Sequence, residues 1–220
     1  MKLLLTSAGI SNKAIYNTLT ELLGKPIAEA NALFIPTAIY PIPDSAEIIR
    51  KVICGSIGDP FCELGWKSLG ILELTSLLSI KQELWLPKLN ETDALLVGGG
   101  DCQYLCYWMQ KSGLAELLPS LLQKTVYVGL SAGSMIMTQF GTTYGHHTLP
   151  PETSKSLGFV DFAIHPHLDH EMFPENSLDH LEKLASSIAV PSYAIDDQTA
   201  IKVTNGNIEV ISEGHWKLFN

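Results

Sequence analysis

The sequence predicts an α/β fold in which helices flank a central, mostly parallel sheet. The main observation is that short apolar runs alternate along the chain with segments of helical period, because parallel strands need crossover connections. The expected strands are "KLLLTS" from Lys2, "ALFIPT" from Ala32, "LGILEL" from Leu69, "ALLVGGG" from Ala94 and "VYVGLS" from Val126.

A second observation concerns the C-terminal part of the chain. The segment "TAIKVTNGNIEVIS" alternates apolar and polar residues on both sides of Asn205 and Gly206. This dipeptide suits the positive φ angles of a type I′ turn, so we expect a terminal β-hairpin at one edge of the sheet.

Helical patterns lie between and after the expected strands. They cover residues 11–23, 44–54, 102–111, 114–123 and 176–188. In the last of these, Leu178, Leu181, Leu184 and Ile188 fall on one face, which is typical of a helix that packs on a core.

Composition limits the classes of protein that the chain can be. It has 220 residues, of which 46% are hydrophobic, so we expect one domain over residues 1–220. The 23 acidic and 14 basic residues give a net charge of -9, and the basic residues are scattered, which disfavours nucleic acid or an anionic membrane as partner. No apolar run reaches the length of a signal core or a membrane span, and the four cysteines form no CxxC pair. We expect a soluble, cytoplasmic monomer or homodimer with reduced thiols.

The segment Gly129-Leu130-Ser131-Ala132-Gly133 matches the G-x-S-x-G nucleophile elbow, in which a buried strand leads to a serine on a sharp turn before a helix. Small residues two before and two after Ser131 would leave its hydroxyl exposed, and the N–H of Ala132 would lie where an oxyanion forms. The alternative interpretation is a small-residue turn that only packs a helix against a strand.

A glycine run, Gly98-Gly99-Gly100, ends the preceding strand of the expected sheet. Parallel strands place ligands at their carboxyl ends, so the backbone of Gly99 or Gly100 could supply a second oxyanion donor. A phosphate-binding loop is the alternative. It is disfavoured because "GGGDCQ" is not G-x-G-x-x-G and Asp101 would repel a phosphate.

Three histidines lie in "AIHPHLDHEMF", where residues 165–170 satisfy H-x-H-x-D-H, a pattern similar to the zinc signature of metallo-β-lactamase-like hydrolases. A metal held by His165, His167 and His170 could activate a water molecule without Ser131. Metallo-β-lactamase-like hydrolases carry this motif near the start of the chain, on an αββα sandwich. Here the residues before the motif predict a parallel α/β sheet instead, which disfavours the metal site. The alternative use of His167, at the end of the expected strand "FVDFAI", is as general base for Ser131. A structural role for His165 and His170 is also open.

These segments resemble the peptidase S51 family, the group of peptidase E and cyanophycinase. The likeness lies in "LLVGGG", "VGLSAGS", "HPHL" and "YAIDDQTAIKVTNG". The resemblance implies a flavodoxin-like three-layer sandwich similar to class I glutamine amidotransferases, with a Ser-His pair and no metal or other cofactor. By motif position it implies that Ser131 is the nucleophile and His167 the base, with oxyanion donors from the backbone of Gly99, Gly100 and Ala132.

The same resemblance assigns the third catalytic residue. The family has an acidic residue before the C-terminal hairpin, which falls here on Asp197, with Asp196 adjacent. Peptidase E also has an acid in the loop after the elbow helix, but the loop here, "TTYGHHTLPP", has none. The absence of that acid keeps open a third hypothesis, a non-catalytic binding protein on the same sheet.

The expected function is that of a serine peptidase acting on small peptides, with the segment 141–158 narrowing its entrance. The resemblance to peptidase E implies a site that binds the carboxylate of an aspartyl residue. Arginine is the preferred side chain for binding a carboxylate through two hydrogen bonds. The only arginine in the chain, Arg50, is far from the motifs in sequence. Where the family has its arginine, this chain has Ser177 or Leu178. We therefore expect dipeptides with N-terminal aspartate to be poor substrates, unless His146, His147, His165 or His170 is protonated in the site.

Overall fold

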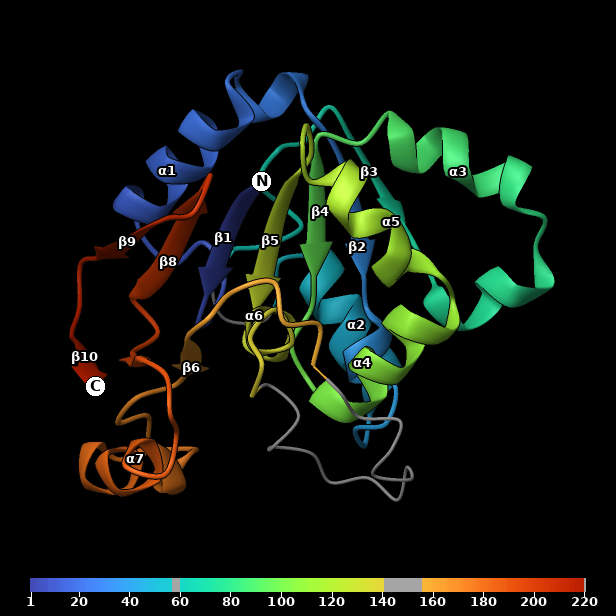
Figure 1. Cartoon of the computed structure of the whole chain (residues 1–220). Helices are drawn as coiled ribbons and strands as arrows, with labels where there is room; N and C mark the ends of the chain where they lie inside the picture. Colours follow the sequence, from blue (N-terminus) through green and yellow to red (C-terminus); the bar gives the residue numbers. More distant parts are fainter. Residues whose placement is uncertain (57–59, 141–155, 220) are drawn as a thin grey trace.

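The structure is a computed structural model that describes residues 1–56, 60–140 and 156–219. Its centre is a seven-stranded sheet in the order β3-β2-β4-β5-β1-β8-β9 (Figure 1). The first five strands in this order are parallel, and β8 and β9 run antiparallel as the terminal hairpin. The bounds are β1 Lys2–Thr6, β2 Asn31–Ile35, β3 Ser68–Ile71, β4 Ala94–Val97, β5 Val126–Leu130, β8 Thr199–Thr204 and β9 Asn207–Ser212. The predicted mostly parallel sheet is thus confirmed.

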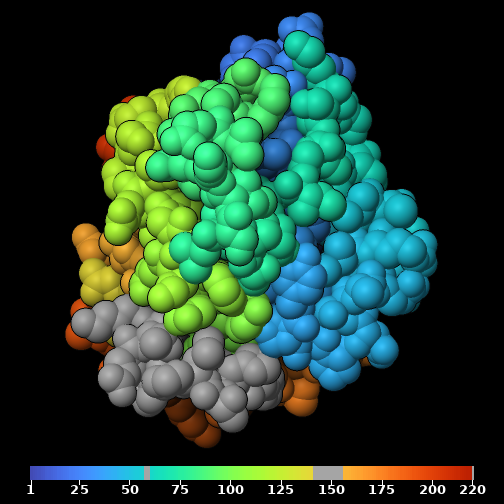
Figure 2. All heavy atoms as spheres, turned by 90° about the vertical axis from the view of Figure 1, so that its right-hand side faces the viewer, coloured from blue at the N-terminus to red at the C-terminus, as the bar shows by residue number. Residues whose placement is uncertain are grey.

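Helices cover both faces of this sheet, which makes three layers. Successive residues of a strand point to opposite faces, so Leu4 packs with one set of helices while Leu3 and Leu5 pack with the other. One face is covered by α1 Lys13–Leu23 and α2 Ser45–Ile53, and the other by α3 Gln82–Asn90, α4 Cys102–Lys111, α5 Leu114–Leu121 and α6 Ala132–Met135. Figure 2 shows the green segment that contains α3 at the molecular surface.

A second, three-stranded sheet in the order β10-β7-β6 lies beside the first. It contains β6 Ala163–His165, β7 Ser192–Ile195 and β10 Trp216–Phe219, and α7 Leu178–Ala185 packs near it through Leu181. The expected strand "FVDFAI" therefore corresponds to β6, which ends at His165. Our placement of His167 at the strand end was wrong, because Pro166 has no N–H with which to continue the ladder.

The terminal hairpin has the predicted turn. Asn205 and Gly206 have φ angles of 50° and 88°, and Thr204 pairs with Asn207 across the two-residue loop. The last predicted helix is shorter than expected, and Leu178 at its start is 40% exposed rather than part of the core. Short 3-10 helices complete the fold at η1 Ile27–Glu29, η2 Thr37–Ile39, η3 Leu74–Ser79 and η6 Pro174–Asn176. None of the helices in the described ranges is long and apolar enough to cross a membrane.

Candidate active site

Ser131 lies on the turn between β5 and α6, with φ 49° and ψ -109°. A positive φ is costly for a residue with a side chain, so the turn is strained and must be held by its surroundings. The N–H of Ser131 donates to the carbonyl of Thr6 at 3.1 Å, and its own carbonyl accepts from the N–H of Ser134 at 2.8 Å. The strand-to-helix elbow expected from the sequence is present in the structure.

The close packing of the elbow helix on the sheet requires glycine at Gly129 and Gly133. A Cβ atom at Gly129 would lie 2.7 Å from the backbone of Gly133 and Ser134, and one at Gly133 would lie 2.2 Å from the carbonyl oxygen of Val97. These glycines let α6 pack directly on β5 and β4.

His167 connects Ser131 to Asp197. Its Nε2 atom lies 2.9 Å from Ser131 Oγ, and its Nδ1 atom lies 2.7 Å from Asp197 Oδ1. A proton on Nδ1, donated to the carboxylate, leaves Nε2 free to accept the serine hydroxyl proton. The ring of Phe173 stacks on the imidazole with centroids 4.6 Å apart, which fixes the ring plane.

Of the two adjacent aspartates, Asp197 forms the hydrogen bond with His167, whereas Asp196 has other partners. Asp196 accepts bonds from the Thr199 hydroxyl at 2.6 Å and from the His215 N–H at 2.7 Å, so it serves the turn before β8 and the start of β10. Burial alone would raise the pKa of Asp197, but hydrogen bonds from His167 and Ser7 outweigh it and hold that pKa below its usual range. Asp197 is therefore a charged partner for the imidazole.

Gly99 and Ala132 lie next to Ser131, and Gly100 follows Gly99 in the chain. A Cβ atom at Gly99 would lie 3.2 Å from Ser131 Cβ, and one at Gly100 would lie 2.2 Å from the carbonyl oxygen of Ala38. Gly100 also has a φ of 131°, so both spacing and backbone conformation require glycine there. Ala132 is the first residue of α6, and its N–H has no acceptor within the helix. These groups remain candidates for oxyanion donors.

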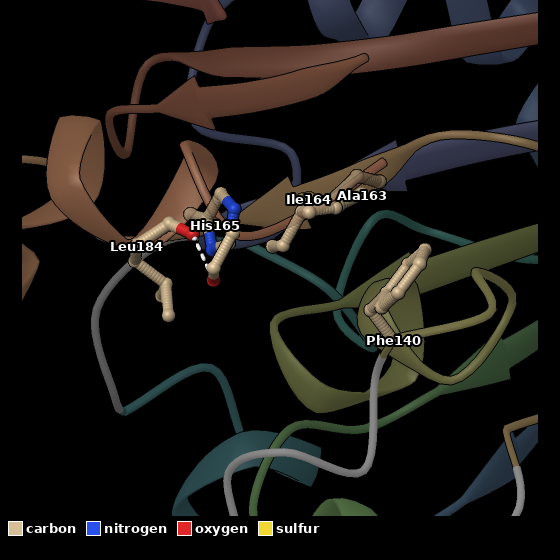
Figure 3. Close-up of a pocket in the computed structure, with 7 residues that line it drawn as sticks. Phe140, Ala163, Ile164, His165 and Leu184 are labelled. Atoms are coloured by element: carbon tan, nitrogen blue, oxygen red, sulfur yellow. Dashed lines mark hydrogen bonds between the residues drawn. The ribbon is translucent and has the colours of Figure 1, made fainter. Parts of the chain in front are cut away.

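The three histidines of the H-x-H-x-D-H segment do not converge. His165 is buried and lines a cavity of about 200 Å³ together with Phe140 and Leu184 (Figure 3). Burial lowers the pKa of His165 to about 4, so it is neutral at physiological pH. Within the described ranges, no group of three or more His, Cys, Asp or Glu side chains is arranged to hold a metal ion.

His170 lies on the other side of the acid, where its Nε2 atom is 3.6 Å from Asp197 Oδ2. The N–H of Met172 donates to His170 Nδ1 at 3.1 Å. Arg50, which is far from the motifs in sequence, pairs with Glu47 on the exposed face of α2. His146 and His147, with the rest of residues 141–155, lie outside the described residues.

Ser7 is the site residue that our sequence analysis missed. It follows β1, is fully buried, and its hydroxyl donates to Asp197 Oδ1 at 2.7 Å. The only signal in the sequence is that the apolar run of β1 ends in two small hydroxyl residues, Thr6 and Ser7, at the edge where parallel strands place ligands.

Fold and site together define the class of protein: an α/β protein whose strained strand-to-helix elbow holds a serine beside a histidine–carboxylate pair. The family model described as Peptidase family S51 matches residues 3–211, nearly the whole chain. The chain therefore belongs to peptidase family S51.

Two related proteins named Peptidase E are consistent with this family membership. A Peptidase E from Streptomyces coelicolor is 36% identical over 84 residues, which cover 37% of this chain and 35% of that protein. A Peptidase E from Shewanella oneidensis is 28% identical over 88 residues, which cover 39% of this chain and 37% of that protein. The match thus spans little more than a third of the length of either relative.

Solved structures share the fold over almost the full chain. A candidate peptidase E from Listeria monocytogenes EGD-e superposes with a TM-score of 0.69 at 22% identity, covering 97% of this chain and 98% of that chain. A peptidase from an acI-B1 Actinobacterium gives a TM-score of 0.68 at 17% identity, covering 98% and 88%. At these identities the likeness establishes the fold.

Proposed function

We propose that this protein is a serine-type peptidase that hydrolyses short peptides through Ser131, His167 and Asp197. The observation that carries the proposal is the 2.9 Å distance between Ser131 Oγ and His167 Nε2 on a strained elbow, with Asp197 2.7 Å from the other ring nitrogen. Membership of a peptidase family supports the same chemistry.

In the proposed reaction, Ser131 Oγ attacks the peptide carbonyl while His167 Nε2 takes the hydroxyl proton. The Asp197 carboxylate stabilises the imidazolium that forms, and backbone N–H groups from Gly99, Gly100 and Ala132 stabilise the oxyanion. His167 then gives the proton to the leaving amine. A water molecule, activated by the same imidazole, hydrolyses the acyl-enzyme and restores the serine.

The substrate is proposed to be a dipeptide or short peptide without an acidic residue at its N-terminus. A buried aspartyl carboxylate needs a cationic partner, and without one its burial costs several kcal/mol. Arg50 pairs with Glu47 on α2 and His165 is neutral because it is buried, so neither of these two groups supplies this cation.

The test is a dipeptide library screen at pH about 6 and about 8, spanning the ordinary histidine pKa. We expect neutral dipeptides to be hydrolysed faster than Asp-X dipeptides at both values, and Ser131→Ala to abolish turnover of all of them. Strong Asp-X preference that persists at the higher pH would contradict the substrate proposal. Unchanged turnover by Ser131→Ala would contradict serine chemistry itself.

A further inference from the structure

The carboxyl end of β1 contacts all three residues of the proposed triad. The carbonyl of Thr6 accepts the N–H of Ser131 at 3.1 Å. The hydroxyl of Ser7 accepts the N–H of His167 at 2.8 Å and donates to Asp197 Oδ1 at 2.7 Å. Thr6, the last residue of β1, and Ser7, which follows it, therefore join the nucleophile turn, the histidine loop and the aspartate turn, three segments that are far apart in the sequence.

Ser7 has the geometry needed to hold a strained arrangement. His167 has a φ of 60°, which a residue with a side chain adopts only when its surroundings impose it. The bond from the His167 N–H to Ser7 Oγ fixes this backbone, while the Ser7 hydroxyl fixes the same carboxylate oxygen that accepts from His167 Nδ1. The serine side chain is fully buried, so water does not compete for either bond.

We propose that Ser7 is a positioning residue that sets the distance and alignment between the His167 imidazole and the Asp197 carboxylate. The proposal rests on the proposed function in one respect: the positioning of this pair changes a reaction rate only if the pair acts on Ser131. Ser7 itself is too deeply buried to touch a substrate. Its effect is on the rate at which Ser131 reacts and on the state of the His167–Asp197 hydrogen bond.

The test compares three variants by two measurements. Ser7→Ala removes both hydrogen bonds, and Ser7→Cys keeps the side-chain volume with a weak donor, so that a folded variant is available. Ser112→Ala is the matched control, because Ser112 is also a buried serine that donates to a backbone carbonyl, that of Met109, and accepts a backbone N–H, that of Leu114.

The first measurement is the second-order rate of labelling by a fluorophosphonate probe, which needs no known substrate. We expect both Ser7 variants to react about 10- to 100-fold more slowly than the native protein, the range that loss of one hydrogen bond to a charged group produces. The second measurement is the low-field proton resonance of the His167–Asp197 hydrogen bond. It should shift or disappear in both Ser7 variants, and Ser112→Ala should leave rate and resonance unchanged.

The proposal is overturned if Ser7→Ala and Ser7→Cys keep the native labelling rate and resonance. It is also overturned if Ser112→Ala changes both to the same extent, because the effect would then be general loosening of the fold. A native protein that shows the resonance but takes no probe would contradict the proposed function alone. In that case the resonance of the Ser7 variants still decides whether Ser7 positions the pair.

Discussion

At the scale of single residues, Ser131 combines backbone strain with a side chain that lies against His167. A non-glycine residue at positive φ costs on the order of 1–3 kcal/mol, so the contacts that hold it must supply at least that much. They come from the Thr6 carbonyl on β1 and from the first turn of α6. The strain places the hydroxyl at the carboxyl edge of the sheet, beside the imidazole.

Asp197 gives the first prediction at this scale. Asp197→Asn should lower kcat/KM for the best peptide substrate about 10³- to 10⁴-fold, because a neutral amide neither stabilises the imidazolium nor holds its proton on Nδ1. Initial rates on the substrate found in the library screen measure this effect. A loss of less than tenfold would show that the 2.7 Å contact with His167 is not used in the reaction.

The neighbouring acid is the natural comparison for this variant. Asp196→Asn weakens the bonds from Thr199 and His215 but leaves the His167 contact intact. It should lower the free energy of unfolding by about 1–3 kcal/mol, as expected when a hydrogen bond to a charged group is weakened, with kcat/KM changed less than tenfold. The reverse pattern, with Asp196→Asn inactive and Asp197→Asn active, would exchange the proposed roles.

At the scale of elements, the elbow depends on how closely α6 approaches β4 and β5. Gly133→Ala should lower the free energy of unfolding by about 3 kcal/mol or more, because the added methyl would meet the Val97 carbonyl and neither backbone can move freely. Urea unfolding measures the stability, and labelling by the fluorophosphonate probe should slow because Ser131 moves with α6.

Gly24→Ala separates this clash from the conformational cost of replacing a glycine. Gly24 ends α1 with φ 69°, and an added Cβ would meet nothing within 4 Å. Its substitution should cost only about 1 kcal/mol and leave labelling unchanged. Equal effects of the two substitutions would contradict the packing explanation for Gly133.

Elements with a strong local pattern could be predicted from the sequence. The five parallel strands are apolar runs, mostly buried except for the edge strand β3, and the hairpin has its turn signal at Asn205 and Gly206. α3 was not predicted because a proline, Pro87, lies within it and its segment, residues 82–90, has little apolar periodicity. The second sheet was not predicted, although a strand at β6 was, because β7 and β10 have only four residues each and their pairing depends on contacts that are distant in sequence.

Site residues could be predicted where a local motif places them in one turn. Residues that reach the site from distant parts of the chain were harder to predict. The positions of Ser131 and Ala132 follow from the elbow pattern, and that of Asp197 followed only from the family resemblance. Ser7 lies 160 residues from His167 and 190 from Asp197, so only the folded sheet brings its hydroxyl to them. The sequence pattern of β1 carries no information about that distance.

At the scale of the whole molecule, buried His165 should make stability depend on pH. Its pKa is near 6.5 when unfolded and about 4 when folded, so between these values the unfolded chain binds the additional proton. The free energy of unfolding should therefore fall as the pH is lowered through this range, by about 2 kcal/mol at pH about 5 from this residue alone. Asp197, whose pKa is lowered, contributes its own loss only at more acidic pH.

Urea unfolding of the native protein and of His165→Gln at pH about 7 and about 5 measures this contribution. Glutamine stays neutral over this range, so the variant should lose less stability on acidification than the native protein does. Comparing the pH dependence, rather than the stability at one pH, removes the cost of the substitution itself. The same loss in both proteins would show that His165 takes up its proton in the folded state.

The central claim is that Ser131 is an activated nucleophile, and the most direct measurement is mass spectrometry after treatment with a fluorophosphonate probe. We predict one probe per chain, mapped to the peptide that contains Ser131, no adduct on Ser131→Ala, and much slower labelling of His167→Gln. A folded native protein that takes no probe, or an adduct on a different serine, would contradict the account.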